Sequence, residues 1–155
     1  MTKQHRFAAR LKWSGGQRSP QVTYESYSRD YTVETPGKPP LPGSGPAVFL
    51  GDEGRYNPEE LLVVSLSACH MLTYLAVCAR AGIKVLAYED DASGTLAMKD
   101  GKMRFIDALM KPLVRVERAD QVGAARELHH KAHDGCFVAN SVSFPVRYEA
   151  NVSAT

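Results

Sequence analysis

The chain is organised around its longest uninterrupted apolar segment, residues 57–81, which reads NPEELLVVSLSACHMLTYLAVCARA. Asn57 is a favoured N-cap, and Pro58 suits the first helical position because no donor is needed there. Glu60 occupies the acidic position of a capping box, and Gly82 suits a left-handed cap at the other end. We therefore predict one helix of roughly 24 residues, about 36 Å long at 1.5 Å per residue.

Apolar residues occur all around this predicted helix and do not form a single stripe. This distribution is typical of a helix that is buried on every side, so we expect it to be the central core helix. Small and hydroxyl residues such as Ser65, Ser67 and Thr73 dilute the apolar run, and its start is acidic. These features argue against a membrane span.

The composition favours one ordinary globular domain, residues 1–155, which would bury about 68–70% of its unfolded surface. The 19 basic and 17 acidic residues give a formal net charge of +2 and form no basic stripe for nucleic acid. We expect small-molecule or protein partners, no nucleic acid and no membrane. The first residues, Met1 to Trp13, carry no apolar signal segment, so we expect a cytoplasmic protein.

The N-terminal region predicts short strands followed by a long loop. Residues 5–13 alternate apolar and charged side chains, as in a half-buried strand, a second strand starts at Val22, and a third covers residues 29–34. Residues 35–56 are rich in proline and glycine, so we predict neither ladder nor helix there. Apolar residues 48–50 of this loop are expected to fold over something, as in a functional lid or rim.

After the central helix, the pattern predicts a β-hairpin. Residues 84–98 and residues 103–117 carry β-type residues, and Asp100-Gly101 between them is a hairpin turn signal. Pro112 should lie at an edge or a bulge, because it cannot donate to the ladder.

The remaining segment predicts one more helix and one more strand. Asp120 can cap a helix that reaches about His133, and Gly135 ends it. Residues 143–152 alternate as a closing strand. Runs of strands separated by two helices indicate an α+β fold.

The chain has three cysteines, and in a reducing compartment these do not form a structural disulfide framework. Cys78 lies nine residues after Cys69, so an ideal helix places the two about 13 Å apart along its axis and on opposite sides. A Cys69–Cys78 disulfide is excluded while the helix is intact, and Cys78 fits a small buried hydrophobe. For Cys69 and Cys136, spacing alone leaves both a buried and a reactive thiol open.

The histidines suggest two rival sites. His129 and His133 share a helical face close to Cys136, as metal ligands do, but no acidic residue lies between them and a fourth ligand is missing. We favour histidines on the helix surface and expect no metal or cofactor. His70 next to Cys69 does not predict a nucleophile–base pair, because helical neighbours point about 100° apart.

The motifs Asn57-Pro58-Glu59-Glu60-Leu61, Ser67-Ala68-Cys69 and Ala132-His133 followed by Cys136 resemble the OsmC/Ohr family of osmotically induced and organic hydroperoxide resistance proteins. The resemblance covers essentially the whole chain. It implies an intertwined homodimer of α+β subunits, with antiparallel sheets around long central helices. It also implies a thiol peroxidase that reduces organic hydroperoxides in oxidative-stress defence and is regenerated by a thiol or dithiol reductant.

Within that resemblance, Cys69 matches the peroxidatic cysteine, Cys136 the resolving cysteine, and Glu59 the acid that orients a catalytic arginine. Two arginines are candidates for the catalytic arginine that Glu59 would orient. Arg18 ends a glycine-rich turn like the one that carries the arginine in the hydroperoxide-resistance branch, and Arg29 follows in the next segment.

The chemistry is consistent with these roles. A thiolate attacks the peroxide, and a second thiol converts the sulfenic acid to a disulfide. Burial would raise the pKa of Cys69, so an adjacent guanidinium paired with Glu59 is a natural activator. Ten residues separate Glu59 from Cys69, about 15 Å along one helix, so we expect Glu59 to serve the site of the other subunit. The alternative is a non-catalytic dimer that binds an apolar ligand under residues 48–50.

Overall fold

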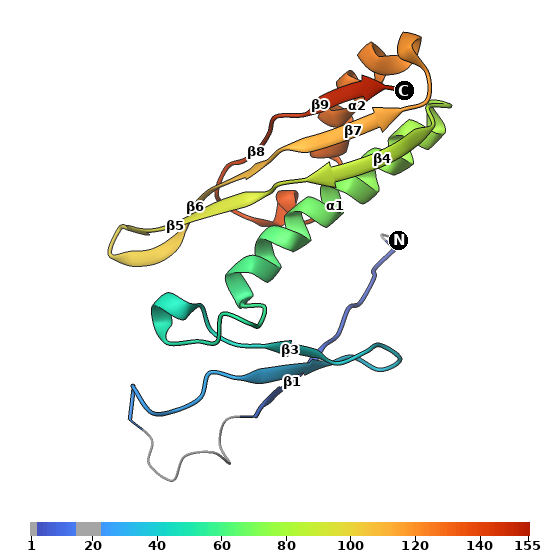
Figure 1. The fold of residues 1–155 in the computed structure, drawn as a ribbon. Helices are drawn as coiled ribbons and strands as arrows, with labels where there is room; N and C mark the ends of the chain where they lie inside the picture. Colours follow the sequence, from blue (N-terminus) through green and yellow to red (C-terminus); the bar gives the residue numbers. More distant parts are fainter. Residues whose placement is uncertain (1–2, 15–22) are drawn as a thin grey trace. The chain divides into compact units, whose positions relative to one another are not determined.

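A computed structural model describes residues 3–14 and 23–155 of the chain. It has the predicted α+β composition and divides after Leu61 into two compact parts, residues 1–61 and residues 62–155. The first part contains a three-stranded antiparallel sheet in the order β1-β2-β3. Its strands are β1 (Arg10–Trp13), β2 (Tyr31–Glu34) and β3 (Leu41–Gly43), drawn in blue and teal in Figure 1.

The N-terminal strands differ from the prediction in extent and in burial. The first strand begins at Arg10 instead of residue 5, and every residue of it is exposed, so the half-buried assignment is wrong. Residues 24–26, expected in a second strand, form a turn, and Val22 lies outside the described residues. Alternation alone misled here, because it indicates which side chains share a face but not whether anything covers that face.

The prediction that residues 35–56 form neither ladder nor helix is also wrong. β3 pairs with β2, with Pro42 opposite Thr32, and residues Ala47–Phe49 form a short 3₁₀ helix, η2. Proline is tolerated in β3 because this strand is the edge of the three-stranded sheet. The apolar residue expected to fold over something, Val48, is 83% exposed in the chain.

The central helix, α1 (Pro58–Arg80), has the predicted caps. The backbone N–H of Glu60 donates to Asn57 Oδ1 at 2.8 Å, and the N–H of Asn57 donates to Glu60 Oε2 at 3.3 Å. This reciprocal pair is a capping box. At the other end Gly82 has φ +70°, and the Ile83 N–H donates to the Cys78 carbonyl at 2.9 Å, as in a left-handed C-cap.

One face of α1 is buried, and the opposite face is not. Its fully buried residues recur every four positions, at Leu66, His70, Tyr74 and Cys78. Leu72, which points the other way, is 63% exposed. The expectation of burial on every side is therefore wrong for a single copy of the chain, because the second part supplies a covering layer on one face only. By length and composition alone α1 could cross a membrane.

Residues 62–155 contain two mixed three-stranded sheets, in the orders β4-β7-β9 and β5-β6-β8. The pairs β4/β7 and β5/β6 are antiparallel, whereas β7/β9 and β6/β8 are parallel. Figure 1 shows the first sheet with the second helix behind it. The strand bounds are β4 (Val85–Asp90), β5 (Ser93–Lys99), β6 (Lys102–Met110), β7 (Pro112–Val116), β8 (Val146–Tyr148) and β9 (Asn151–Ala154).

Each of the three long strands predicted after the helix is split between the two sheets. The hairpin turn itself is confirmed, since Asp100 and Gly101 both have positive φ, +52° and +73°. Pro112 was misplaced, because it starts β7, the middle strand of its sheet. A proline is acceptable at the first residue of a strand. The Lys111 N–H just before it donates to Asp90 Oδ1 at 2.6 Å, which ties β4 to the start of β7.

The second helix, α2 (Val122–Asp134), follows a short 3₁₀ helix, η3 (Ala119–Gln121). Asp120 does not cap it as predicted, because its carboxylate accepts a hydrogen bond from Arg118 Nε at 3.0 Å. Gly135 ends the helix as expected, and a last 3₁₀ turn, η4 (Ala139–Ser141), follows. α2 packs its buried alanines, Ala125 and Ala132, into the core.

Two apolar clusters form the core of the second part. The larger joins α1, α2 and the sheet β4-β7-β9, and the smaller joins α1 to β6 and β8. Each fully buried large apolar side chain in them, such as Leu66 or Val114, contributes about 1.5–3 kcal/mol relative to its exposed state. The larger cluster comprises Tyr74, Cys78, Ile83, Val114, Val116, Ala125, Ala132 and Val152, and the smaller Leu66, Ala108, Met110 and Val146.

Candidate functional site

Two free thiols that are 67 residues apart in sequence are neighbours in the structure. Cys69 lies at the middle of α1 and is half-buried, whereas Cys136 lies just after α2 and is fully buried. The pKa of the Cys136 thiol is raised to about 11, mainly by burial and also by the adjacent Cys69 side chain, against the opposing effect of the Ala139 backbone N–H. The pair therefore joins an accessible thiol to a buried thiol that is protonated at neutral pH.

The chain around Cys136 is tightly held against α1. The Cys136 N–H donates to the His133 carbonyl at 3.2 Å, which continues the end of α2. A Cβ atom at Gly135 would lie 3.2 Å from Thr73 Cγ2 of α1, so glycine permits this close approach. Thr73 Oγ1 in turn donates to the Cys69 carbonyl at 2.8 Å. The two helices thus meet one turn away from the thiol pair.

Cys78 is separate from this pair. It is fully buried in the larger core cluster, and burial raises its pKa. The interpretation of Cys78 as a small buried hydrophobe fits this position, and like Cys69 and Cys136 it is a free cysteine.

Glu59 lies in the first turn of α1 with an incompletely satisfied carboxylate. Its Oε2 atom is buried and has no hydrogen-bond partner among the residues that the structure describes. Burial raises the pKa of Tyr31 on β2, and the charge of Glu59 raises it further, so the two side chains are near each other. A buried carboxylate oxygen without a donor is costly, and a cationic group would satisfy it.

Of the two arginines proposed from sequence, Arg29 lies among the described residues and Arg18 lies outside them. Arg29 is held within its own turn, because its Nη1 donates to the Tyr27 carbonyl at 2.7 Å and its guanidinium lies 4.0 Å from the centre of the Tyr27 ring. In this conformation the Arg29 fork is occupied by backbone carbonyls and aromatic rings, and it is not paired with Glu59.

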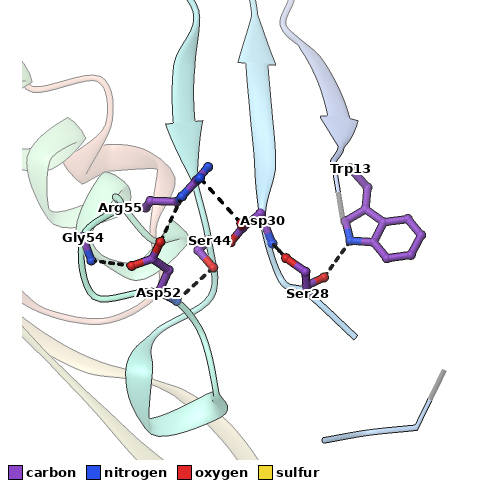
Figure 2. A network of polar contacts seen from close by, with 7 residues as sticks. All are labelled: Trp13, Ser28, Asp30, Ser44, Asp52, Gly54 and Arg55. Carbon is purple, nitrogen blue, oxygen red and sulfur yellow. Dashed lines mark hydrogen bonds and ion pairs between the residues drawn. The ribbon is translucent and has the colours of Figure 1, made fainter. Parts of the chain in front are cut away.

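A third arginine, Arg55, was missed by the sequence reasoning. Its Nε lies 3.1 Å from Asp52 Oδ2, and its Nη2 lies 3.6 Å from Asp30 Oδ2 (Figure 2). Asp52 also accepts the Gly54 N–H at 2.8 Å and donates its own N–H to Ser44 Oγ at 3.1 Å. The spacing Asp52-x-Gly54-Arg55 was the available signal, because an aspartate often accepts a backbone N–H two residues on.

An open pocket of about 300 Å³ lies between α1 and β4. Its polar lining residues include Ser67, whose hydroxyl donates to Asp90 Oδ2 at 2.5 Å. The remaining lining is mainly apolar, and it reaches Ala68, the residue before Cys69. The lining residues are Val63, Val64, Ser67, Ala68, Met71, Tyr88, Glu89, Asp90 and Ala92.

The prediction of surface histidines on α2 is wrong for His129. His129 and His70 are both fully buried, and their rings face each other, whereas His130 is exposed. His133 is half-buried. The described residues contain no group of three or more histidine, cysteine or acidic side chains arranged to hold a metal ion.

Comparison with known proteins gives a consistent assignment. The OsmC-like protein family model matches residues 51–151. An OsmC-like protein of unknown function from Vibrio cholerae has a similar solved structure, with a TM-score of 0.88 and 30% identity over 96% of this chain and 100% of its own. An organic hydroperoxide resistance protein from Elizabethkingia anophelis shares the fold, with a TM-score of 0.70 and 18% identity over 100% of both chains.

A curated relative extends the comparison to nearly full length. The uncharacterized protein YmaD of Bacillus subtilis (strain 168) is 22% identical over 152 residues, which are 96% of this chain and 94% of the relative. The family match includes α1 and the segment around Cys136, the two elements that supply the thiol pair. The chain therefore belongs to the OsmC-like protein family.

Proposed function

We propose that this protein is a thiol-dependent peroxidase that reduces organic hydroperoxides, with Cys69 as the attacking and Cys136 as the resolving cysteine. The observation that carries the proposal is the contact between two free thiols, one half-buried on α1 and one buried after α2. Solved structures of this fold include proteins named for organic hydroperoxide resistance. The proposed setting is oxidative-stress defence in the cytoplasm.

The proposed reaction has two steps at sulfur. The Cys69 thiolate attacks one peroxide oxygen, the S–O bond forms, and the O–O bond breaks. The alcohol leaves after its alkoxide takes up a proton, and Cys69 becomes a sulfenic acid. Cys136 then attacks the Cys69 sulfur, the S–S bond forms, and water leaves. A thiol or dithiol reductant returns the disulfide to two thiols.

The burial of each thiol supports this order. Cys69 is the more accessible of the two, so a hydroperoxide can reach it without rearrangement of the core. Cys136 is fully buried with a raised pKa, so it stays protonated and unreactive toward bulk oxidant. Its proximity to Cys69 then favours intramolecular disulfide formation over attack by a second molecule.

We further propose that Glu59 orients an arginine beside the attacking thiol, with Arg18 and Arg29 as the candidates. The unpartnered buried oxygen of Glu59 supports this role, because a guanidinium would supply the missing donors. Arg29 would first have to leave the Tyr27 carbonyl that now accepts its hydrogen bond.

A homodimer with shared sites is part of the proposal. The exposed apolar side of α1, including Val64 and Leu72, supports it, since a second copy would remove these side chains from water. Subunit mixing tests the sharing: Cys69→Ser and Glu59→Gln homodimers should each be nearly inactive, and the mixed dimer should regain one working site. Mixed dimers that form without any recovery of activity would place the acid within its own chain or outside the reaction.

Intact-mass analysis after one equivalent of cumene hydroperoxide tests the activity itself. The expected product has lost two hydrogen atoms and carries a Cys69–Cys136 cross-link. Cys69→Ser should consume no peroxide, whereas Cys136→Ser should complete one turnover and leave a dimedone-reactive sulfenic acid at Cys69. An unchanged thiol count would remove the peroxidase proposal, and dimedone capture at Cys136 in place of Cys69 would reverse the two roles.

A non-catalytic apolar-ligand carrier is the second candidate. The pocket of about 300 Å³ between α1 and β4 supports it, because most of its lining side chains are apolar. A carrier has no need of the thiol pair, so binding of a non-oxidising aryl alcohol should be equal in wild type and Cys69→Ser. Saturable binding together with an inert thiol pair would favour the carrier over the peroxidase.

A further inference from the structure

The centre of the α1–α2 contact contains a histidine pair that the proposed reaction does not use. His70 Nε2 of α1 lies 3.0 Å from His129 Nδ1 of α2, and the two rings are nearly parallel, at 8°. Both side chains have 0% exposure. The ring of Tyr74 stacks on His129 with 3.8 Å between centroids. Two titratable rings are thus enclosed at the contact of these helices.

A single hydrogen bond joins the two rings, and the other nitrogen of each ring takes no part in it. Each neutral imidazole carries one N–H, so one ring donates across the 3.0 Å gap and the other accepts. His70 Nδ1 and His129 Nε2 are buried and have no partner in the described part of the chain. When both rings are protonated, two N–H groups face each other and the bond is lost. One proton alone leaves a buried charge.

The surroundings offer little to stabilise that charge. The groups facing the pair are Tyr74 from α1, His133 from α2 and Tyr148 from β8. Tyr74 in turn has Cys78 of α1 and Tyr88 of β4 beside it. The acids of α2 that act in this region, Glu127 and Asp134, act on Tyr148. Neither His70 nor His129 forms an ion pair among the described residues. Protonation therefore places uncompensated charge inside the contact.

The position of the pair links it to the thiols. His70 directly follows Cys69 on α1, and His129 lies seven residues before Cys136 at the end of α2. A Cβ atom at Gly135, next to Cys136, would lie 3.2 Å from Thr73 Cγ2 of α1, so the approach of the two thiols depends on α2 staying against α1.

We propose that the His70–His129 pair is a pH-dependent latch, which holds α2 and with it Cys136 against α1 while both rings are uncharged and releases α2 when they take up protons. The latch itself does not depend on the peroxidase activity. Its consequence, that acid slows closure of the Cys69–Cys136 disulfide, rests on the proposed function.

The sign of the effect follows from burial. Burial, with a smaller effect of the neighbouring His133, lowers the pKa of His70 from 6.5 to about 4. Burial, with a smaller effect of His70, lowers the pKa of His129 from 6.5 to about 4. The released state binds protons from about pH 6.5 downward, whereas the closed state resists them until about pH 4. The closed state is therefore fully favoured above about pH 6.5 and loses its advantage as the pH falls toward 4.

Hydrogen exchange at pH 7 and pH 5, expressed as protection relative to the intrinsic rate at each pH, measures the latch without any peroxide. The α2 amides of the wild type should lose about tenfold or more of their protection at pH 5. The variant His70→Gln/His129→Asn places neutral amides where the two bonded nitrogens lie, so its α2 protection should change little. His130→Gln, an exposed neighbour on the same helix, should behave like the wild type.

Two outcomes would overturn the latch: equal α2 protection of the wild type at both pH values, or an equal loss in the double variant. If the double variant fails to fold, NMR titration of the histidine rings in the wild type decides the matter. The ring signals of His70 and His129 should not titrate between pH 7 and about 5.5. Titration of either ring near pH 6.5 would reject the latch. A latch that works in a protein with inert thiols would instead reject only the peroxidase.

Discussion

Residues 1–61 and residues 62–155 are stabilised by different kinds of contact. All of the buried apolar side chains that form the two clusters belong to the second part. In the described portion of the first part, the fully buried residues are Gly43 and Ser44, and β1 is exposed at every position. The first part is instead stabilised by strand pairing and by the Arg55–Asp52 network. In addition, the Trp13 Nε1–H donates to the Ser28 carbonyl at 2.7 Å (Figure 2).

This contrast shows which part carries its own stability. A small sheet without a covered apolar face is marginal in water, so the first part needs additional cover. Large apolar side chains such as Leu11 and Trp13, 63% and 54% exposed, would be removed from water by the second copy that we propose. The substitutions below test how far this difference extends.

The largest effect is expected in the core of the second part. Leu66 is 1% exposed, so Leu66→Ala should lower the free energy of unfolding by about 2–5 kcal/mol, through lost burial and a residual cavity. Leu72→Ala on the same helix is the matched control, because Leu72 is 63% exposed in one copy. Urea unfolding at two protein concentrations measures the loss of stability in both variants. A loss for Leu72→Ala that grows on dilution would show that a partner covers this face, and equal, concentration-independent losses would contradict the contrast.

A smaller effect is expected where backbone packs on backbone in the first part. A Cβ atom at Gly51 would lie 1.6 Å from the Gly45 carbonyl oxygen, so Gly51→Ala must push the two backbone segments of the η2 loop apart. We expect this to lower the free energy of unfolding by about 1–3 kcal/mol. Hydrogen exchange should show the loss of protection confined to residues 44–56. Gly123→Ala on α2 is the control, because its new Cβ meets nothing within 4 Å and alanine favours helix. A global loss of protection in Gly51→Ala would mean that the two parts unfold together.

Gly135→Ala should have a milder effect on the thiol pair. The new Cβ would lie 3.2 Å from Thr73 Cγ2, so α2 and α1 must separate by a few tenths of an ångström. We expect this separation to lower the free energy of unfolding by about 1 kcal/mol. The rate of Cys69–Cys136 disulfide formation with a mild oxidant measures the separation. The double variant Gly135→Ala/Thr73→Ser removes the Cγ2 methyl and should restore the wild-type rate. Failure of this rescue would assign the loss to the backbone at residue 135 and not to the contact.

The smallest effect is expected at the exposed ion pair on the first sheet. Lys12 Nζ and Glu34 Oε2 lie 2.9 Å apart with side chains 52% and 37% exposed, so Lys12→Met should change stability by no more than about 0.2–1 kcal/mol. Arg55→Met should cost more, because the Arg55 side chain is only 27% exposed and contacts two carboxylates. Thermal unfolding at low and high salt ranks the two. An equal loss would mean that the Arg55 network stabilises the first part no more than a surface pair does.

Local rules were readable in the sequence. Asn57, Glu60 and Gly82 define both ends of α1 through hydrogen bonds that span only a few residues. The turn at Asp100-Gly101 is equally local. Such features need no knowledge of the rest of the chain. The cysteine motifs likewise indicated the family, because they are patterns of residue type and spacing.

Tertiary structure decided what covers each element and what meets across the fold. The alternation in β1 was real, yet all of its residues are exposed. Apolar residues do occur all around α1, yet its fully buried residues lie on one face. His129 looked like a surface residue because a polar side chain is normally solvated, and its burial depends on His70, 59 positions away. Burial and contact depend on where distant segments pack, and a single sequence encodes this only through the summed energy of the whole fold.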